Sequence, residues 1–373
     1  MIKQKEHIKK IDSLRGIAIL GVFLFHAQIM LLSEYNSDKY GENGFLIISG
    51  FKKYIYNFSP ISFGWTGVEL FLIISGFLIH YGYLSKSNEF KATNFYQRRF
   101  WRIYPPYLLA LIYCSFLGMG IRYYFFSVEG FSDFCSHIFF LHNLRGKFFF
   151  NINASFWSLA LEMQLYFLYP LILLMRDKIG ISKTFFTILI LSFILLGIGM
   201  ISEDSIPFFK SPTYERSVFK YWFIWCSGAL LAESYFMRIK IFKKYEVFIF
   251  LIGFFLTVTS KGNKYTNYFT VYFVTISWLA FFEWYLSTNK INSNNYPVKF
   301  LSVLGICSYS FYLFHFSLLG YFLNYFDLFG QSSSSIILRV TISFFLIFFI
   351  SYFLYLIIEK PSISLGQKLM SKK

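Results

Sequence analysis

Long apolar stretches dominate this chain and restrict what it can fold into. A helix needs about 20 apolar residues to cross the hydrocarbon core of a bilayer, which is about 30 Å thick. Ten stretches approach or reach this length, at residues 14–33, 64–84, 100–121, 156–175, 184–201, 218–236, 246–260, 267–286, 303–325 and 336–358. The chain is 56% hydrophobic and 14% charged, whereas soluble domains carry about 25% charged residues. The sequence therefore predicts an all-α polytopic membrane protein, a bundle of about ten transmembrane helices.

The basic residues indicate how these helices are oriented. Most of the 35 Lys and Arg residues fall at the two termini and in alternate connections, such as 176–183 and 237–245. Because cytoplasmic segments of membrane proteins are enriched in Lys and Arg, we expect both termini in the cytoplasm. This arrangement explains most of the net charge of +16 without a nucleic-acid partner. The long connections 34–63 and 122–155 are then extracytoplasmic.

Other sequence features favour a single membrane domain. The four cysteines, Cys114, Cys135, Cys226 and Cys307, are far apart, which predicts neither a zinc site nor a disulfide framework. The Lys-rich N-terminus precedes a long apolar stretch with no A-x-A cleavage pattern, so we expect the first helix to be retained. No hydrophilic stretch is long enough for a separate soluble domain. We therefore expect one transmembrane domain over residues 1–373, without a metal ion.

Four ionisable residues share one predicted depth in the membrane. His26, Glu69, Glu162 and His315 each fall inside an apolar stretch, roughly 7–13 Å below the outer face of the bilayer. Ionisable residues inside a membrane are rare and usually functional. For any one of them alone, a hydrogen bond between helices is the competing interpretation. Together they predict a catalytic or gating layer.

Four arginines are predicted at the cytoplasmic face. Arg15 precedes His26 by eleven residues, which puts both side chains on one helix face, about 16 Å apart along the axis. Arg98, Arg99 and Arg102 are expected to begin the third helix, where the helix N-terminus would add a field that favours anions. These three residues either bind a polyphosphate or anchor the helix at the interface.

Two tryptophans are predicted at the outer edge of the membrane. Trp65 begins the second apolar stretch and Trp157 begins the fourth. Tryptophans at this level commonly anchor helices in the headgroup region. Stacking on a sugar substrate is the alternative for both residues.

Six motifs in a fixed order resemble acyltransferase family 3, integral membrane enzymes that move acyl groups, commonly acetyl, onto surface carbohydrates. The motifs are DSLRGIAILGVFLFH, GWTGVELFLIISGFLI, RRFWRIYPPY, WSLALEMQLYFLYP, SYSFYLFH and IEKP, and they extend from residue 11 to residue 361. The chain departs from the family at two places: Glu69 stands where the family often has Asp, and Met163 stands where a second Glu is expected.

The resemblance implies an acyl-CoA-dependent O-acyltransferase in the cytoplasmic membrane of a bacterium, with acetyl-CoA as the default donor and a carbohydrate or glycolipid acceptor. It implies essential roles for Arg15 and His26 and acyl-CoA contacts for the cluster Arg98, Arg99 and Arg102.

The four intramembrane residues then have catalytic roles. His26 would act as general base on the acceptor hydroxyl or briefly carry the acyl group. Glu69 or Glu162 would orient the imidazole, and His315 is a second candidate base.

Two other classes of function fit the same residues. A carrier for a lipid-linked sugar or a small anion would use the ionisable layer as a gate or proton relay. An assembly or sensor protein would tolerate replacement of His26. The acceptor, the acyl length, the side of the membrane on which transfer occurs and the oligomeric state are open from the sequence.

Overall fold

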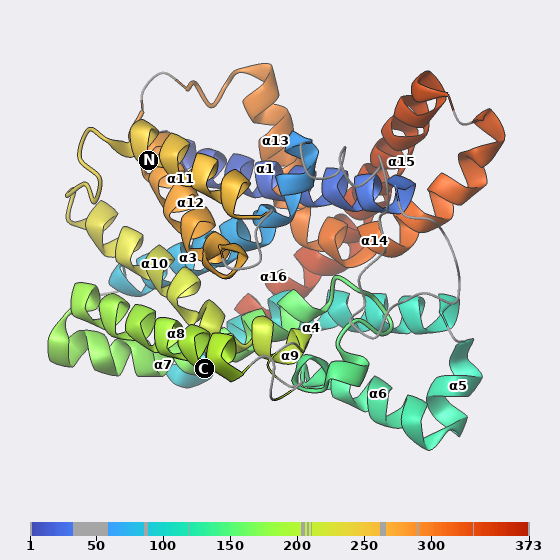
Figure 1. Cartoon of the computed structure of the whole chain (residues 1–373), viewed down its shortest axis with the longest axis horizontal. Helices are drawn as coiled ribbons and strands as arrows, with labels where there is room; N and C mark the ends of the chain where they lie inside the picture. The colour runs from blue at the N-terminus through green and yellow to red at the C-terminus, as the bar shows by residue number, and fades with distance from the viewer. Residues whose placement is uncertain are drawn as a thin grey trace. The chain divides into compact units, whose positions relative to one another are not determined.

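The computed structural model describes residues 2–32, 59–85, 89–118, 120–202, 206, 209, 211–261, 266–288, 291–330 and 332–371. Most of the predicted outer connection 34–63 therefore lies outside the described residues. Every regular element in these ranges is helical (Figure 1), as the sequence predicts. The chain divides into two compact units, and each is considered by itself.

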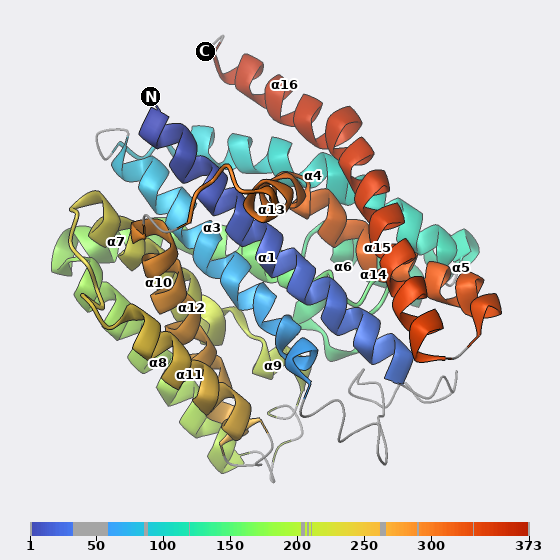
Figure 2. The same cartoon turned by 90° about the horizontal axis from the view of Figure 1, so that it is seen from above.

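Unit 1 comprises Met1–Ala18, Trp65–Glu89 and Leu161–Ser302. It holds the first part of α1 (Ile2–Leu32), α3 (Gly67–Leu84), most of α7 (Trp157–Ile179), α8 (Ile181–Ser202), α9 (Pro212–Glu215), α10 (Val218–Phe236), α11 (Glu246–Ser260), η5 (Asn267–Phe269), α12 (Thr270–Ser287) and the start of α13 (Tyr296–Ile306). Within it, α10 packs against α3, α8 and α12, and α12 lies beside α11 in both views (Figures 1 and 2).

Unit 2 comprises Ile19–Gly64, Phe90–Ala160 and Val303–Lys373. It holds the rest of α1, most of η1 (Pro60–Thr66), α4 (Ala92–Leu117), α5 (Gly120–Phe126), α6 (Val128–Ile138), η2 (His142–Leu144), η3 (Gly146–Phe148), α14 (Ser308–Tyr325), η6 (Phe326–Phe329), α15 (Ser333–Leu354), η7 (Tyr355–Glu359, a π-helical turn) and α16 (Lys360–Ser371). Within it, α14 packs on α15 and α4, and α16 runs beside α4.

Six helices among the described residues are long and apolar enough to cross a membrane: Lys9–Leu32, Pro60–Leu84, Trp157–Ile179, Ile181–Ser202, Asn267–Ser287 and Ser333–Ser371. They correspond to six of the ten predicted spans. The predicted spans 100–121 and 218–236 lie on α4 and α10, which are less apolar, and 246–260 lies on the 15-residue α11. The protein is therefore a multi-pass helical membrane protein.

The predicted span 303–325 is not one straight helix. The helix Tyr296–Ile306 ends before Cys307, and the helical stretch Ser308–Phe329 continues at an angle of 79° to it. Counting this bent pair as one span gives seven. No proline or glycine occupies position 307, so the hydropathy pattern runs through the bend without marking it.

The helix surfaces match a lipid environment. Along α8, Thr184 and Ser192 are buried while Phe186, Ile190 and Ile194 are exposed. Ser192 Oγ lies 2.8 Å from the hydroxyl of Tyr272 on α12. Polar side chains thus pair inside the unit, and the apolar ones face outward, as lipid requires.

Close helix packing in unit 1 depends on two glycines. A Cβ atom added at Gly76 of α3 would collide with the carbonyl oxygen of Trp225 on α10, and one at Gly228 of α10 would collide with the carbonyl oxygen of Ile73 on α3. Small residues allow two membrane helices to approach until their backbones touch. This contact places the polar residues of α3 and α10 described below.

Replacing Gly76 by Ala should therefore destabilise the protein by about 1–3 kcal/mol, because the backbone of α10 must move to admit the methyl group. Gly82→Ala is the matched control, since Gly82 lies on the same helix and, apart from its own helix backbone, no atom of the described residues lies within 4 Å of a Cβ there. We expect the control to be neutral or slightly stabilising. Thermal unfolding of both variants in the same detergent tests this, and equal melting temperatures would contradict the close-packing account.

Candidate active site

The structure joins two of the predicted catalytic residues directly. His26 lies on the part of α1 in unit 2, and His315 lies on α14 of the same unit. His26 Nδ1 is 2.9 Å from His315 Nε2, and the ring centroids are 5.0 Å apart. On its other side, His315 Nδ1 is 2.7 Å from the carbonyl oxygen of Tyr312. His26 and His315 are called the histidine dyad below.

These contacts determine where the protons lie when both rings are neutral. A carbonyl oxygen only accepts hydrogen bonds, so Nδ1 of His315 must carry the proton. Nε2 of His315 is then an acceptor, and Nδ1 of His26 must donate to it. Nε2 of His26 is left with a free lone pair. This is the arrangement of a general base or nucleophile oriented by a second group.

Aromatic rings surround the dyad within unit 2. The ring of Phe316 meets His26 edge-on at 5.1 Å, and Phe311 stacks on His315 at 6.1 Å. Phe23 of α1 packs against Phe311 and against Phe344 of α15. His315 itself is fully buried. An apolar surrounding of this kind strengthens the hydrogen bonds inside it.

The two candidate glutamates lie in unit 1. Glu162 Oε1 accepts hydrogen bonds from Ser75 Oγ of α3, at 2.8 Å, and from the hydroxyl of Tyr166. The indole of Trp225 donates in turn to Ser75 Oγ. Glu69 is 1% exposed, and its Oε2 has no hydrogen-bond partner among the residues that the structure describes. The prediction that either glutamate orients His26 stays a prediction.

Arg15 lies on the part of α1 in unit 1, where its Nη1 is 3.5 Å from Asp12 Oδ1. Helix α1 runs without interruption from Ile2 to Leu32. Arg15 and His26 therefore lie on one continuous helix, as predicted.

The expected position of the arginine cluster at a helix start is wrong. Helix α4 begins at Ala92, six residues before Arg98, so Arg98, Arg99 and Arg102 lie in its second and third turns. The field of a helix N-terminus falls off within the first turn, and these arginines must act by their own charge. Arg98 is exposed, whereas Arg99 and Arg102 are half-buried.

The two candidate tryptophans are both half-buried. Trp65 lies in η1, next to the start of α3. Trp157 is the first residue of α7, and its ring lies nearly parallel to that of Phe149, with centroids 6.0 Å apart. A flat pair of this kind suits either an interfacial anchor or a sugar platform.

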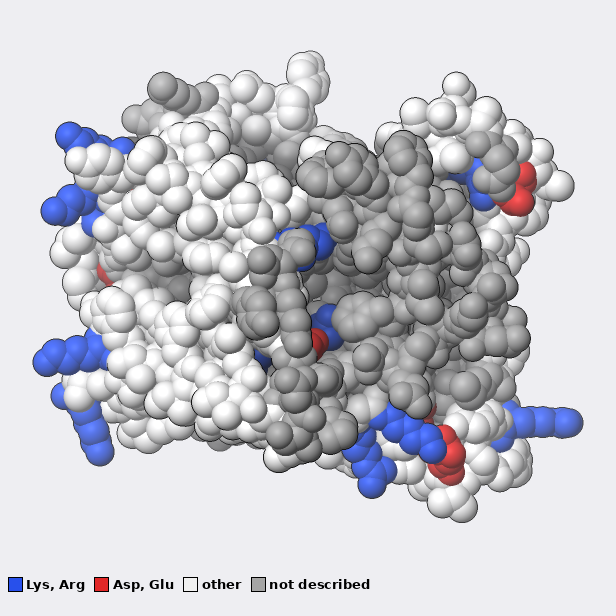
Figure 3. Space-filling view, in the orientation of Figure 1, with Lys and Arg blue, Asp and Glu red and all other residues white. Residues whose placement is uncertain are grey.

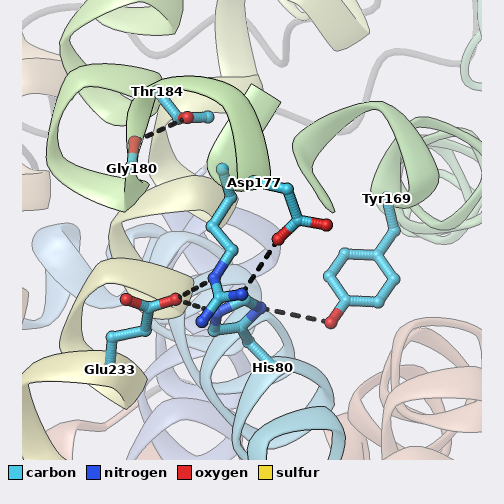
Figure 4. Close-up of polar contacts among 7 residues, drawn as sticks. His80, Tyr169, Asp177, Gly180, Thr184 and Glu233 are labelled. Atoms are coloured by element: carbon cyan, nitrogen blue, oxygen red, sulfur yellow. Dashed lines mark hydrogen bonds and ion pairs between the residues drawn. The ribbon is translucent and has the colours of Figure 1, made fainter. Parts of the chain in front are cut away.

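A buried charged cluster in unit 1 was not predicted from the sequence. Figure 4 shows His80 of α3 between Tyr169 of α7 and Glu233 of α10. Glu233 Oε1 is 3.1 Å from His80 Nε2 and also accepts a hydrogen bond from Arg176 Nε. Since Glu233 accepts, His80 donates through Nε2 and accepts the Tyr169 hydroxyl at Nδ1. Asp177 receives a further bond from Arg176.

This cluster ties together the C-terminal ends of α3, α7 and α10 in unit 1. Every member has a complementary partner, and His80 is fully buried. The sequence offered one signal, a third histidine inside an apolar stretch, but its partners are distant in sequence and belong to other helices. The cluster therefore stabilises the packing of these three helices.

Replacing Glu233 by Gln should destabilise the protein by about 1–3 kcal/mol, because the charge of Arg176 loses its buried counter-charge. Asp177→Asn removes a more exposed partner of the same arginine and should cost less than about 1 kcal/mol. Chemical or thermal unfolding in detergent measures both variants. A larger loss of stability for Asp177→Asn than for Glu233→Gln would contradict this stabilising role of Glu233.

A second histidine pair lies in unit 2, outside the candidate spans. The rings of His137 and His142 are parallel and 3.9 Å apart, and both are fully buried. His137 Nδ1 is 3.1 Å from Asp133 Oδ1, and its Nε2 is 3.1 Å from the carbonyl oxygen of Asn151. Burial, together with the neighbouring His137 ring, holds the pKa of His142 well below its ordinary value of 6.5.

The protein should therefore lose stability as the pH falls through about 6.5, because the unfolded chain then binds a proton that folded His142 does not. His142→Phe keeps a flat ring on His137 and removes the titrating group. The drop in melting temperature between about pH 7.5 and about pH 5.5 should be smaller in this variant than in the native chain. An identical drop would show that His142 contributes nothing.

In the part of the chain that the structure describes, no group of three or more His, Cys, Asp or Glu side chains is placed to hold a metal ion.

Comparison with known proteins identifies the family of this chain. The model of an acyltransferase domain, acyltransferase 3, matches residues 8–356. The O-acetyltransferase OatA of Staphylococcus aureus is 23% identical over 354 residues, which is 86% of this chain and 52% of the relative. An uncharacterized protein of Haemophilus influenzae is 31% identical over 166 residues, covering 41% of this chain and 66% of its own. No solved structure matches.

The chain thus spans about half the length of its S. aureus relatives. The family model, in contrast, covers nearly the whole of this chain, from α1 into η7. This chain belongs to acyltransferase family 3.

Proposed function

We propose that this protein is a membrane O-acyltransferase that moves an acyl group, with acetyl as the first expectation, from cytoplasmic acyl-CoA to a hydroxyl of a surface carbohydrate or its lipid-linked precursor. Membership of the acyltransferase family supports the reaction class. The S. aureus relative is an O-acetyltransferase, which supports acetyl as the acyl group. The observation that carries the proposal is the histidine dyad, with its free lone pair on His26 Nε2.

The dyad suits acyl transfer to a hydroxyl. His26 Nε2 takes the proton of the acceptor hydroxyl while the hydroxyl oxygen forms a bond to the thioester carbonyl carbon. The tetrahedral intermediate then breaks its carbon–sulfur bond, and His26 returns the proton to the CoA thiolate. As a variant, His26 Nε2 itself attacks the thioester carbonyl carbon, and the carbon–sulfur bond breaks to release the CoA thiolate. The acceptor hydroxyl then attacks the acyl group, the bond to Nε2 breaks to restore neutral His26, and the hydroxyl proton goes to the thiolate. In both routes His315 holds the His26 ring and shares the positive charge that develops on it.

The remaining candidate residues have proposed roles in binding the donor and the acceptor. We expect the phosphates of the donor to contact Arg15, Arg98, Arg99 and Arg102. A guanidinium group can donate two parallel hydrogen bonds to the oxygens of one phosphate. Trp65 and Trp157 are expected to contact the acceptor. Acetyl-CoA as donor, without a metal ion, is part of the same proposal.

We further propose ten membrane crossings with both termini in the cytoplasm of a bacterium, counting α4, α10 and α11 as spans. Within unit 1, basic side chains at the α7–α8 and α10–α11 turns, on the left of the view in Figure 3, support this orientation. The exposed basic residues of these turns are Lys178, Lys183, Arg238, Lys240, Lys243 and Lys244. Turns rich in Lys and Arg face the cytoplasm. The family model, which covers parts of both units, supports one domain.

The proposal is tested by transfer of labelled acetyl from acetyl-CoA into the lipid and polysaccharide fractions of membranes that contain the protein. Loss of a general base should lower the rate at least about 100-fold in His26→Ala. His7→Ala, which removes an imidazole that precedes the candidate span Lys9–Leu32, is the control at matched expression. Equal labelling by His26→Ala and the native chain would exclude the dyad as the catalytic centre. No labelling by the native chain, with acetyl or longer acyl donors, would favour a carrier.

A further inference from the structure

The segment 151–158, called the strap below, crosses unit 2 between η3 and the first turn of α7. Ile152 within it has a φ of 61°. A β-branched residue rarely adopts a positive φ, because its side chain collides with its own backbone there. Such a conformation persists only where the surrounding contacts enforce it, and it is found often at functional sites. The contacts of the strap must therefore enforce this conformation.

Asn153 fixes the strap to the backbone of α14. The side chain is 3% exposed, and its Oδ1 accepts hydrogen bonds from the backbone N and the hydroxyl of Ser155, at 2.9 and 2.7 Å. Its Nδ2 donates to the carbonyl oxygen of Leu313 on α14, at 3.2 Å. One buried amide thus holds the strap to the turn of α14 that precedes His315.

Tyr312 makes the second connection between the strap and α14. Its hydroxyl donates to the carbonyl oxygen of Ser155, at 3.0 Å, and lies 2.6 Å from Ser158 Oγ. The carbonyl oxygen of the same tyrosine accepts the Nδ1 hydrogen bond of His315. A chain of hydrogen bonds therefore runs from the strap through Tyr312 to His315 and on to His26.

We propose that Tyr312 is a positioning residue for acyl transfer: its hydroxyl, held by the strap, sets the α14 turn whose carbonyl orients His315, which in turn orients His26. The inference rests on the proposed function, since it assigns a role in that reaction. Tyr312 acts only through His315. A displacement of about 1 Å in a catalytic group can lower the rate about 100-fold, so a remote hydroxyl can affect turnover.

Tyr309 provides a control on the same helix. Its hydroxyl donates to the carbonyl oxygen of Ile103 on α4, at 2.8 Å. Tyr309→Phe and Tyr312→Phe therefore delete the same kind of bond, from a tyrosine hydroxyl to a backbone carbonyl, one turn apart. The carbonyl oxygen that lies 2.7 Å from His315 Nδ1 belongs to Tyr312 and not to Tyr309.

The test measures acetyl transfer as kcat and KM for the native chain, Tyr312→Phe and Tyr309→Phe, each with His315 present and in the His315→Ala background. We expect Tyr312→Phe to lower kcat about 10- to 100-fold with KM changed less than about twofold. In the His315→Ala background the same substitution should change kcat less than about twofold, because the group through which it acts is gone. Tyr309→Phe should have a small effect in both backgrounds.

Ser158→Ala is the second variant, in case Tyr312→Phe does not fold. It removes the other hydroxyl at the same junction, and it should lower kcat in the same direction with the same dependence on His315. An unchanged kcat in well-folded Tyr312→Phe, or an equal loss with and without His315, would overturn the positioning role. His26-dependent transfer by the native chain would then leave the proposed function intact, whereas a native chain without transfer would overturn both.

Discussion

The carbonyl oxygen of Tyr312, in the second turn of α14, determines which nitrogen of His26 is left without a proton. It fixes the proton of His315 on Nδ1, and the 2.9 Å contact between the rings transfers this constraint to His26. In these contacts a backbone dipole orients the proposed base through an intervening imidazole rather than through a carboxylate. In an apolar bundle this has an advantage: a neutral carbonyl avoids the large cost of burying a charge.

The surrounding structure provides what this hydrogen bond needs. The bend of 79° after α13 starts a new helix at Ser308, so the direction of α14 is set independently of α13. The strap then fixes the turn around Leu313, and the aromatic rings of Phe311 and Phe316 pack against the two imidazoles. Charged groups in unit 1 follow a different rule, in which His80, Glu233 and Arg176 satisfy one another.

Part of this arrangement was predictable from the sequence. Apolar length identified the helices of six candidate spans, and helix geometry placed Arg15 and His26 correctly on one continuous helix. Equal depth brought His26 and His315 into the same layer. Depth alone gave no rotation about the helix axes, so it could not distinguish the His315 contact from contacts of Glu69 or Glu162. The contact between His26 and His315 depends on tertiary structure, namely on how α1 and α14 pack within unit 2.

Other features could not be predicted, for reasons visible in particular residues. Helix α4 starts at Ala92 rather than near residue 100, because polar residues of the sequence KATNFYQRR form helical turns that hydropathy does not detect. The bend at Cys307 has no proline to mark it. The contacts of His80 could not be predicted because its partners, Tyr169 and Glu233, come from helices far along the chain.

The most direct test of the account is the protonation state of the His26 ring nitrogens. Nitrogen-15 NMR of histidine-labelled protein in lipid nanodiscs, with His26→Gln and His315→Gln to assign the signals, distinguishes the two neutral tautomers. We predict that both His26 and His315 carry the proton on Nδ1, and that removing His315 lets His26 populate both tautomers. A His26 ring protonated on Nε2 in the native chain would contradict it, since the nitrogen proposed to act on substrate would have no lone pair.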